Sequence, residues 1–279
     1  MSFAFTRDFA RHRLGLIGLA LIVALLAFCF LGPLIDPTDQ IHANIDLTSV
    51  GPSAGHPLGT DANGYDVLGR LMVGGRASLE IGFAVAALAT TFGALWGAIA
   101  GFSGGALDAL MMRIVDALLA LPAVFVLIYL ATITEPTLPL LIGVIALLSW
   151  LGPARLIRSE TLSLRTREFI AATRAMGAGH SRTIVRHVLP NTAGTLVVNA
   201  TFQVADAIIL LATLSFLGFG LPPPAATWGG MLYQGISYLL DGYWWEVYPA
   251  GLMIMLTVIA FNLVGDALRE TIDTRLAQR

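Results

Sequence analysis

Three polar side chains interrupt a long apolar stretch in the last third of the chain: Asn199, Gln203 and Asp206. Their spacing of four and then three residues places them on one face of a helix. On a helix that crosses a bilayer, polar side chains avoid lipid and face either water or other protein. The stripe therefore either lines a solute path, with Asp206 as its charged member, or forms a polar seam that packs against a neighbouring helix.

A second group of residues suits docking to another protein rather than a reaction. The stretch 155–192 contains seven arginines and is predicted to be helical from about Glu168. That helix has small side chains on one face, and Gly177 is expected to end it, since glycine is a common helix stop. The residues that carry this interpretation are Glu168, Ala171, Ala172, Gly177, Ala178, Leu189 and Pro190. The alternative is an ordinary arginine-rich loop with a surface helix.

The residue types that catalysis or nucleotide binding needs are missing or scattered. All sixteen basic residues are arginines, and a P-loop needs a lysine to reach the nucleotide phosphates, so the chain is not a P-loop ATPase. The five histidines lie apart in termini and loops, and no cluster has metal-ligand spacing. We therefore expect no catalytic residue, no metal site and no cofactor on this chain.

The composition is that of a membrane protein. Of the 279 residues, 56% are hydrophobic and only 12% are charged, against about 25% charged in soluble domains. The apolar residues fall into runs of about 20, the helical length that crosses a bilayer core. The predicted fold is an all-α integral membrane protein with about six transmembrane helices. These are expected at 14–35, 81–102, 113–133, 137–154, 193–216 and 247–265.

Two features of the predicted spans concern their packing. Gly93, Gly97 and Gly101 recur every four residues and permit close approach of a second helix. Pro122 lies inside the third span, where a membrane helix tolerates proline if neighbours satisfy the freed carbonyl. The predicted organisation is a tail over 1–13, a first span over 14–35, an outer loop over 36–80, a core over 81–268 that includes the loop 155–192, and a tail over 269–279.

The arginines predict the orientation of the spans. With the N-terminus in the cytoplasm and alternation thereafter, fourteen of the sixteen arginines lie inside and only Arg70 and Arg76 lie outside. Cytoplasmic loops of membrane proteins carry an excess of basic residues. We therefore expect both termini and the loop 155–192 in the cytoplasm.

The stretch from Glu168 to Pro190 resembles the cytoplasmic EAA-type loop of ABC importer permeases, in its two small residues, its glycine and its distal Leu-Pro. Two positions depart from that motif. Ala171 stands where the motif usually has glutamate, and Thr173 stands where it has a second alanine. Glu168 is a candidate replacement for the missing glutamate.

Other segments resemble the dipeptide, oligopeptide and nickel branch of these permeases, in consistent order along nearly the whole chain. Tyr65 stands where that branch usually has arginine, and Ala212 where many members have glutamate. The matching segments are 11–18, 56–61, 64–68, 113–116, 121–122, 214–220 and 228–231.

The resemblance implies a type I importer permease in the bacterial inner membrane, for dipeptides or oligopeptides. It also implies the partners: a second, homologous permease, two ATPase subunits or domains, an extracytoplasmic substrate-binding protein and membrane lipid, but no nucleic acid. ATP and Mg²⁺ would be bound by the ATPase partners. In such permeases the loop carries a coupling helix that docks into a groove on the ATPase.

Two alternatives remain open from the sequence. A nickel-type or other small-solute permease shares most of these motifs, although the absence of histidine from the predicted spans favours peptides. An ion-driven secondary transporter would need ionisable residues within its spans, and Asp206 is the only acid deep within a predicted one.

Overall fold

The computed structural model describes residues 12–133 and 135–277 and is helical throughout, apart from connecting loops and an isolated antiparallel bridge between Thr60 and Asp66. Of the predicted N-terminal tail, residues 1–11 lie outside this description. Residues 278–279 of the predicted C-terminal tail also lie outside it, as do the side chains of 273–277.

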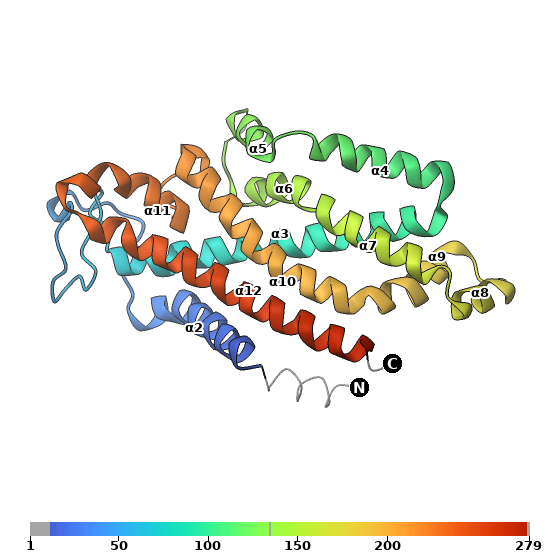
Figure 1. Cartoon of the computed structure of the whole chain (residues 1–279). Coiled ribbons are helices and arrows are strands. Elements are labelled where there is room, and N and C mark those ends of the chain that lie inside the picture. Colours follow the sequence, from blue (N-terminus) through green and yellow to red (C-terminus); the bar gives the residue numbers. More distant parts are fainter. Residues whose placement is uncertain (1–11, 134, 278–279) are drawn as a thin grey trace.

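Four long helices run along the molecule (Figure 1): α2 (Arg13–Ile35), α3 (Val67–Ser103), α10 (Leu189–Leu214) and α12 (Tyr248–Ala277). π-helical turns at Ile184–Val188 and Ser215–Phe219 extend α10, so one apolar element reaches from His180 to Phe219. Each of the four is long and apolar enough to cross a membrane, and the described residues hold up to six spans if two bent helix pairs are included. The predicted all-α membrane fold is confirmed.

The two bent pairs replace helices that we predicted to be continuous. The predicted third span falls on two helices, α4 (Gly105–Leu119) and α5 (Ala123–Thr132), which meet at 77°. We predicted that Pro122 would lie inside one continuous helix. Instead it lies at this break, as the N-cap of α5. The fourth span consists of α6 (Leu138–Ser149) and α7 (Leu151–Leu164), bent by 41°.

Several helices are longer than predicted. Helix α3 begins at Val67 rather than Ile81, so the end of the predicted outer loop is helical. Polar residues such as Arg70 and Glu80 lower the hydropathy of this first part and hide it from a hydropathy criterion. Helix α7 continues into the predicted loop 155–192, and α12 continues past Gly265 through the described part of the predicted tail.

The glycine repeat of α3 permits its close contact with α7, as predicted. A Cβ atom built on Gly93 would lie 2.7 Å from the Trp150 carbonyl oxygen, and one on Gly101 would lie 2.8 Å from that of Arg158. Gly97 meets the Ala154 carbonyl in the same way. Because these neighbours are backbone atoms that cannot rotate away, any larger residue would force the two helices apart.

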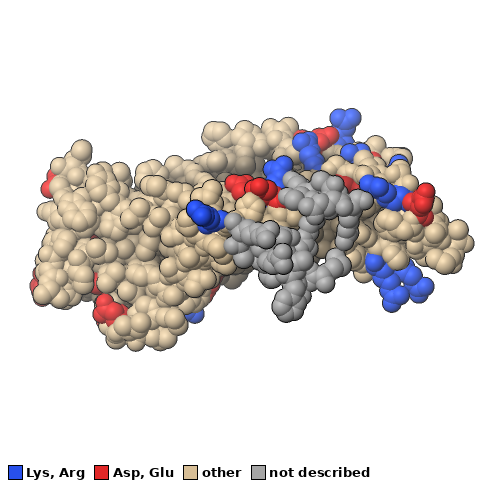
Figure 2. Space-filling model, turned by 60° about the horizontal axis from the view of Figure 1, so that its bottom comes forward, with Lys and Arg blue, Asp and Glu red and all other residues tan. Residues whose placement is uncertain are grey.

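The ends of the molecule differ in content. At one end, the loop 36–66 lies beside α11 (Trp228–Gly235) and the 3₁₀ turns Ile236–Asp241 and Trp244–Glu246. At the other lie the short helices α8 (Glu168–Ala175) and α9 (His180–Thr183). We call these the α11 end and the α8 end. Figure 2 shows that arginine side chains on the displayed face gather over the half that contains α8.

Candidate functional site

The turn after α8 has the geometry of a Schellman motif. The Gly177 N–H donates to the Arg174 carbonyl at 2.9 Å, and the Ala178 N–H donates to the Thr173 carbonyl at 3.2 Å. Gly177 has φ = +83°, and nothing lies within 4 Å of a Cβ atom built on it. Glycine is therefore favoured here by its backbone angles rather than by lack of space. The predicted helix start at Glu168 and its end before Gly177 agree with the structure.

Helix α8 exposes its small side chains. Glu168, Ala171 and Ala172 are all exposed, and Met176 at the C-cap is 81% exposed. The opposite face is held by Ile170, which is fully buried against α3 and α7. The helix thus has one face packed on the core through Ile170 and one exposed face with small side chains at Ala171 and Ala172.

Phe102, at the C-terminal end of α3, holds both sides of the turn. The guanidinium carbon of Arg174 lies 4.4 Å from the centroid of the Phe102 ring. The ring of His180 meets the same phenyl ring edge-on, with 5.4 Å between centroids. Because Phe102 is only 2% exposed, both contacts are backed by the packed core. Sequence reasoning placed Phe102 at the end of a span and gave it no role.

The connection from the turn to α10 is continuous. After Gly179, α9 leads through the π turn into α10, where Leu189 and Pro190 form the first helical turn rather than a break before it. Pro190 has no N–H to donate, and it lies just after the π turn, where the helical hydrogen-bond pattern changes. Ile184 and Val188 are buried in the same cluster as Ile170. Through this cluster, α8 packs on the π turn that leads into α10.

Arginine side chains fix α7, which precedes α8, to its neighbours. Arg158 donates two hydrogen bonds to Asp108 of α4, at 2.5 and 2.7 Å. Arg165, at the C-cap of α7, donates to the Gly101 carbonyl at 3.1 Å. The arginines of this segment therefore hold α7 against α4 and α3 in addition to carrying charge.

The polar stripe of α10 is divided by the structure. Gln203 is buried, and its side-chain amide donates to the Ser149 carbonyl at the end of α6. That carbonyl would otherwise bond the N–H of residue 153, which is a proline without one. Gln203 thus satisfies a backbone group at a helix break, which matches the packing-seam interpretation for this residue.

Asn199 and Asp206 line different cavities. Asn199 borders a cavity of about 360 Å³ together with Phe202 of α10 and residues of α7 and α12. Asp206 borders an open groove of about 340 Å³ with Ser149, Gln203, Ile209 and Leu210. The structure therefore brings Gln203 and Asp206 together but leaves Asn199 apart from them.

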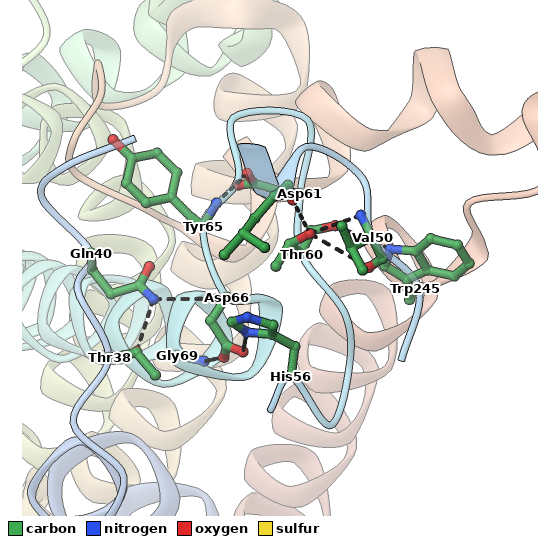
Figure 3. Close-up of polar contacts among 11 residues, drawn as sticks. Thr38, Gln40, Val50, His56, Thr60, Asp61, Tyr65, Asp66, Gly69 and Trp245 are labelled. Atoms are coloured by element: carbon green, nitrogen blue, oxygen red, sulfur yellow. Dashed lines mark hydrogen bonds and ion pairs between the residues drawn. The ribbon is translucent and has the colours of Figure 1, made fainter. Parts of the chain in front are cut away.

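The α11 end contains a dense network of polar contacts (Figure 3). The Asp66 carboxylate caps α3 by accepting from the Gly69 N–H at 2.8 Å, and its second oxygen meets His56 Nδ1 at 2.8 Å. Gln40 Nε2 donates to the Asp66 carbonyl at 3.3 Å. This network fixes the loop 36–66 to the start of α3.

Arg70 is the buried cation of this end and was missed as a structural residue. It is 1% exposed, donates to the Pro224 carbonyl at 2.6 Å, and lies 3.5 Å from the Asp61 carboxylate. Its guanidinium carbon lies 4.1 Å from the centroid of the Tyr65 ring. Asp61 and Asp66, which closely precede Arg70 in the sequence, were the signal that this arginine has an acidic partner. Tyr65, expected in an outer-loop signature, is itself only 5% exposed.

The same network reaches the start of α12. Trp245 Nε1 donates to the Thr60 carbonyl at 3.1 Å (Figure 3). Ser49 Oγ donates to the Glu246 carboxylate at 2.8 Å. Among the residues that the structure describes, no three histidine, cysteine or acidic side chains are placed to hold a metal ion. Hydrogen bonds and the buried pair of Arg70 with Asp61 organise the α11 end.

Comparison with known proteins gives consistent matches. Residues 93–278 match the model of the binding-protein-dependent transport system inner membrane component, and residues 4–52 match the N-terminal transmembrane domain of oligopeptide transport permease C. A dipeptide transport system permease of Bacillus subtilis is 34% identical, covering 99% of this chain and 87% of the relative. A putative peptide permease of Brucella suis is 43% identical (96% and 89%), and an oligopeptide transport system permease of Bacillus subtilis is 37% identical (96% and 88%).

Proposed function

Because this chain belongs to the family of inner membrane components of binding-protein-dependent transport systems, we propose that it is a permease subunit of an ATP-driven importer of dipeptides or oligopeptides. The support for a peptide substrate is that relatives matched over nearly their full length are named as dipeptide or oligopeptide permeases. The family also accounts for the multi-pass bacterial membrane protein described above.

In this proposal the α8 end faces the cytoplasm and the α11 end faces outward. The concentration of arginine toward α8 supports that orientation. A second, homologous permease completes the path, and a substrate-binding protein delivers the peptide to the α11 end. Two ATPase subunits or domains bind ATP and Mg²⁺, since this chain has no lysine for a P-loop.

The proposed coupling element is α8 with its Gly177 turn. The observation that carries it is the division of α8 into a free face, at Ala171 and Ala172, and a face anchored through Ile170. A partner that pushes on the free face moves a helix already packed on α3 and continuous with α10. Phe102 makes the turn move with the end of α3, because it contacts residues on both sides.

Cross-linking in reconstituted vesicles tests this assignment. With Cys29 replaced by alanine, a cysteine at Ala178 should cross-link to the ATPase subunit of the complete complex. The matched control is Leu240→Cys at the α11 end, which is 97% exposed and should react with thiol reagents but give no ATPase cross-link. Peptide uptake should require ATP and the added ATPase. Uptake by the pure chain alone, or cross-links from Leu240→Cys but not from Ala178→Cys, would overturn the proposal.

A further inference from the structure

Asp206 is an acidic residue far from the ends of a long apolar helix, where a charge is costly to bury in lipid. It lies thirteen residues before Phe219, the end of the apolar element, which is about 20 Å along a helix. A bilayer core is about 30 Å thick, so a core that begins near Phe219 contains this carboxyl group. Ionisable groups at such depth are costly and usually face a water-filled cavity or the interior of an assembly.

Three other acids, on α3 and α4, have arginine partners on this chain. Asp108 pairs with Arg158, Asp116 with Arg155, and Glu80 with Arg76. Across residues 12–133 and 135–277, by contrast, Asp206 has no hydrogen-bond or ion-pair partner. Its carboxyl group is therefore available to a group that this chain does not supply.

The groove around Asp206 defines what it could bind. Gln203 is already engaged by the Ser149 carbonyl, and the remaining wall is formed by Ile209 and Leu210. The groove is thus an apolar, open surface with one carboxyl group, exposed rather than covered by other helices of this chain. An unpaired carboxylate in such surroundings attracts a cation and repels an anion.

We propose that Asp206 is a transient binding point for an amino group in its ammonium form during passage of the transported molecule. The inference rests on the proposed function, because a peptide with a free N-terminus carries such a group whatever its side chains are. The absence of an arginine beside Asp206 suits passage, since one ion pair without supporting contacts holds its ligand weakly. The competing occupant is a cationic side chain of the second permease.

Charge-selective thiol labelling next to Asp206 tests the site without relying on a peptide. In the complete complex with Cys29→Ala, a cysteine at Ile209 is treated with ethyltrimethylammonium and ethylsulfonate methanethiosulfonates, with rates normalised to a free thiol. The cationic reagent should react about thirtyfold faster than the anionic one, because one charge at 4 Å in water attracts the first and repels the second by about 1 kcal/mol each. Asp206→Asn should remove that preference. A control cysteine at Leu240 should show the same rate ratio with and without Asp206→Asn.

Uptake provides the second measurement. Asp206→Asn should lower ATP-driven uptake of a free-amino tripeptide about fivefold, whereas Asp206→Glu and the control Glu80→Gln should retain it. Equal labelling rates for the two reagents, or no labelling at Ile209→Cys in any nucleotide state, would overturn the proposal. So would loss of the second permease from purified Asp206→Asn complexes, because the charge would then pair between subunits. Cation preference in a complex that imports no peptide would overturn only the proposed substrate.

Discussion

The two ends of this permease use polar residues in opposite ways. At the α11 end, Asp66, Arg70 and Glu246 are each at most 5% exposed and their contacts cross between distant segments. At the α8 end, Arg174 and Glu168 are exposed, and α8 is held by one buried isoleucine and the Phe102 ring.

This difference indicates different mechanical roles. A buried polar network with several partners rigidifies the segments that it joins, because breaking any one contact leaves another group unsatisfied. A short exposed helix with few buried contacts opens and moves at lower cost. We therefore expect the α11 end to act as a fixed frame and the α8 end as the part that a partner displaces. The variants of Arg70, Asp66 and Phe102 test this difference, and the one with the largest expected loss of stability comes first.

The largest effect is expected from Arg70→Met. The change leaves the Asp61 carboxylate without its buried cation and the Pro224 carbonyl without its donor. Breaking a buried ion pair from one side should lower the free energy of unfolding by about 3 kcal/mol. Denaturant unfolding of the purified chain in detergent measures it. The control Arg76→Met, on a pair whose arginine side chain is 59% exposed, should cost less than about 1 kcal/mol. Equal losses for the two variants would contradict a rigid α11 end.

A smaller effect is expected from Asp66→Ala. It removes the N-cap bond to Gly69 and the contact with His56, and losing a helix cap costs about 1 kcal/mol. Hydrogen exchange should rise in 56–70 and stay unchanged in α8. Asp46→Ala, at an exposed position of the same loop, is the matched control. Exchange that rises equally at both ends would show that the ends are not independent.

At the α8 end, Phe102→Leu should cost about 1 kcal/mol, because leucine fills most of the volume but loses the ring contacts with Arg174 and His180. We expect faster hydrogen exchange in 168–183 and transport that falls more than ATP hydrolysis. Phe92→Leu, which changes a ring packed on Trp96 and Trp150, should leave exchange in α8 unchanged. An unchanged ratio of transport to hydrolysis in Phe102→Leu would remove Phe102 from the coupling route.

The sequence predicted those features that depend on local pattern. Apolar runs located the spans, the four-residue glycine repeat predicted the close approach of a second helix, which is α7, and Gly177 marked the end of α8. These features follow from helix geometry and from the backbone freedom of glycine, and both depend on residues that are close in sequence.

The features that the sequence did not predict depend on residues that are distant in sequence. Whether Pro122 bends or breaks a span is decided by the surrounding helices, and here α4 and α5 meet at 77°. Gln203 donates to the Ser149 carbonyl on another helix. That carbonyl has no helical donor because the residue four positions later, at 153, is a proline. Arg70 could be placed only once Pro224 and Asp61 were known to converge on it. Each of these is a tertiary contact that no local pattern encodes.

The central claim is that the Gly177 turn passes ATP-driven motion to the spans, and paired glycine variants test it most directly. Gly177 and Gly179 both have open space where a side chain would go, but only Gly177 has a positive φ. Gly177→Val should therefore strain the turn, by about 1–2 kcal/mol or more for a branched residue, while Gly179→Val should not. Vesicles that contain the complete complex report peptide uptake per ATP hydrolysed. We predict that this ratio falls in Gly177→Val and is unchanged in Gly179→Val, with both chains inserted normally. An unchanged ratio in Gly177→Val would contradict the account.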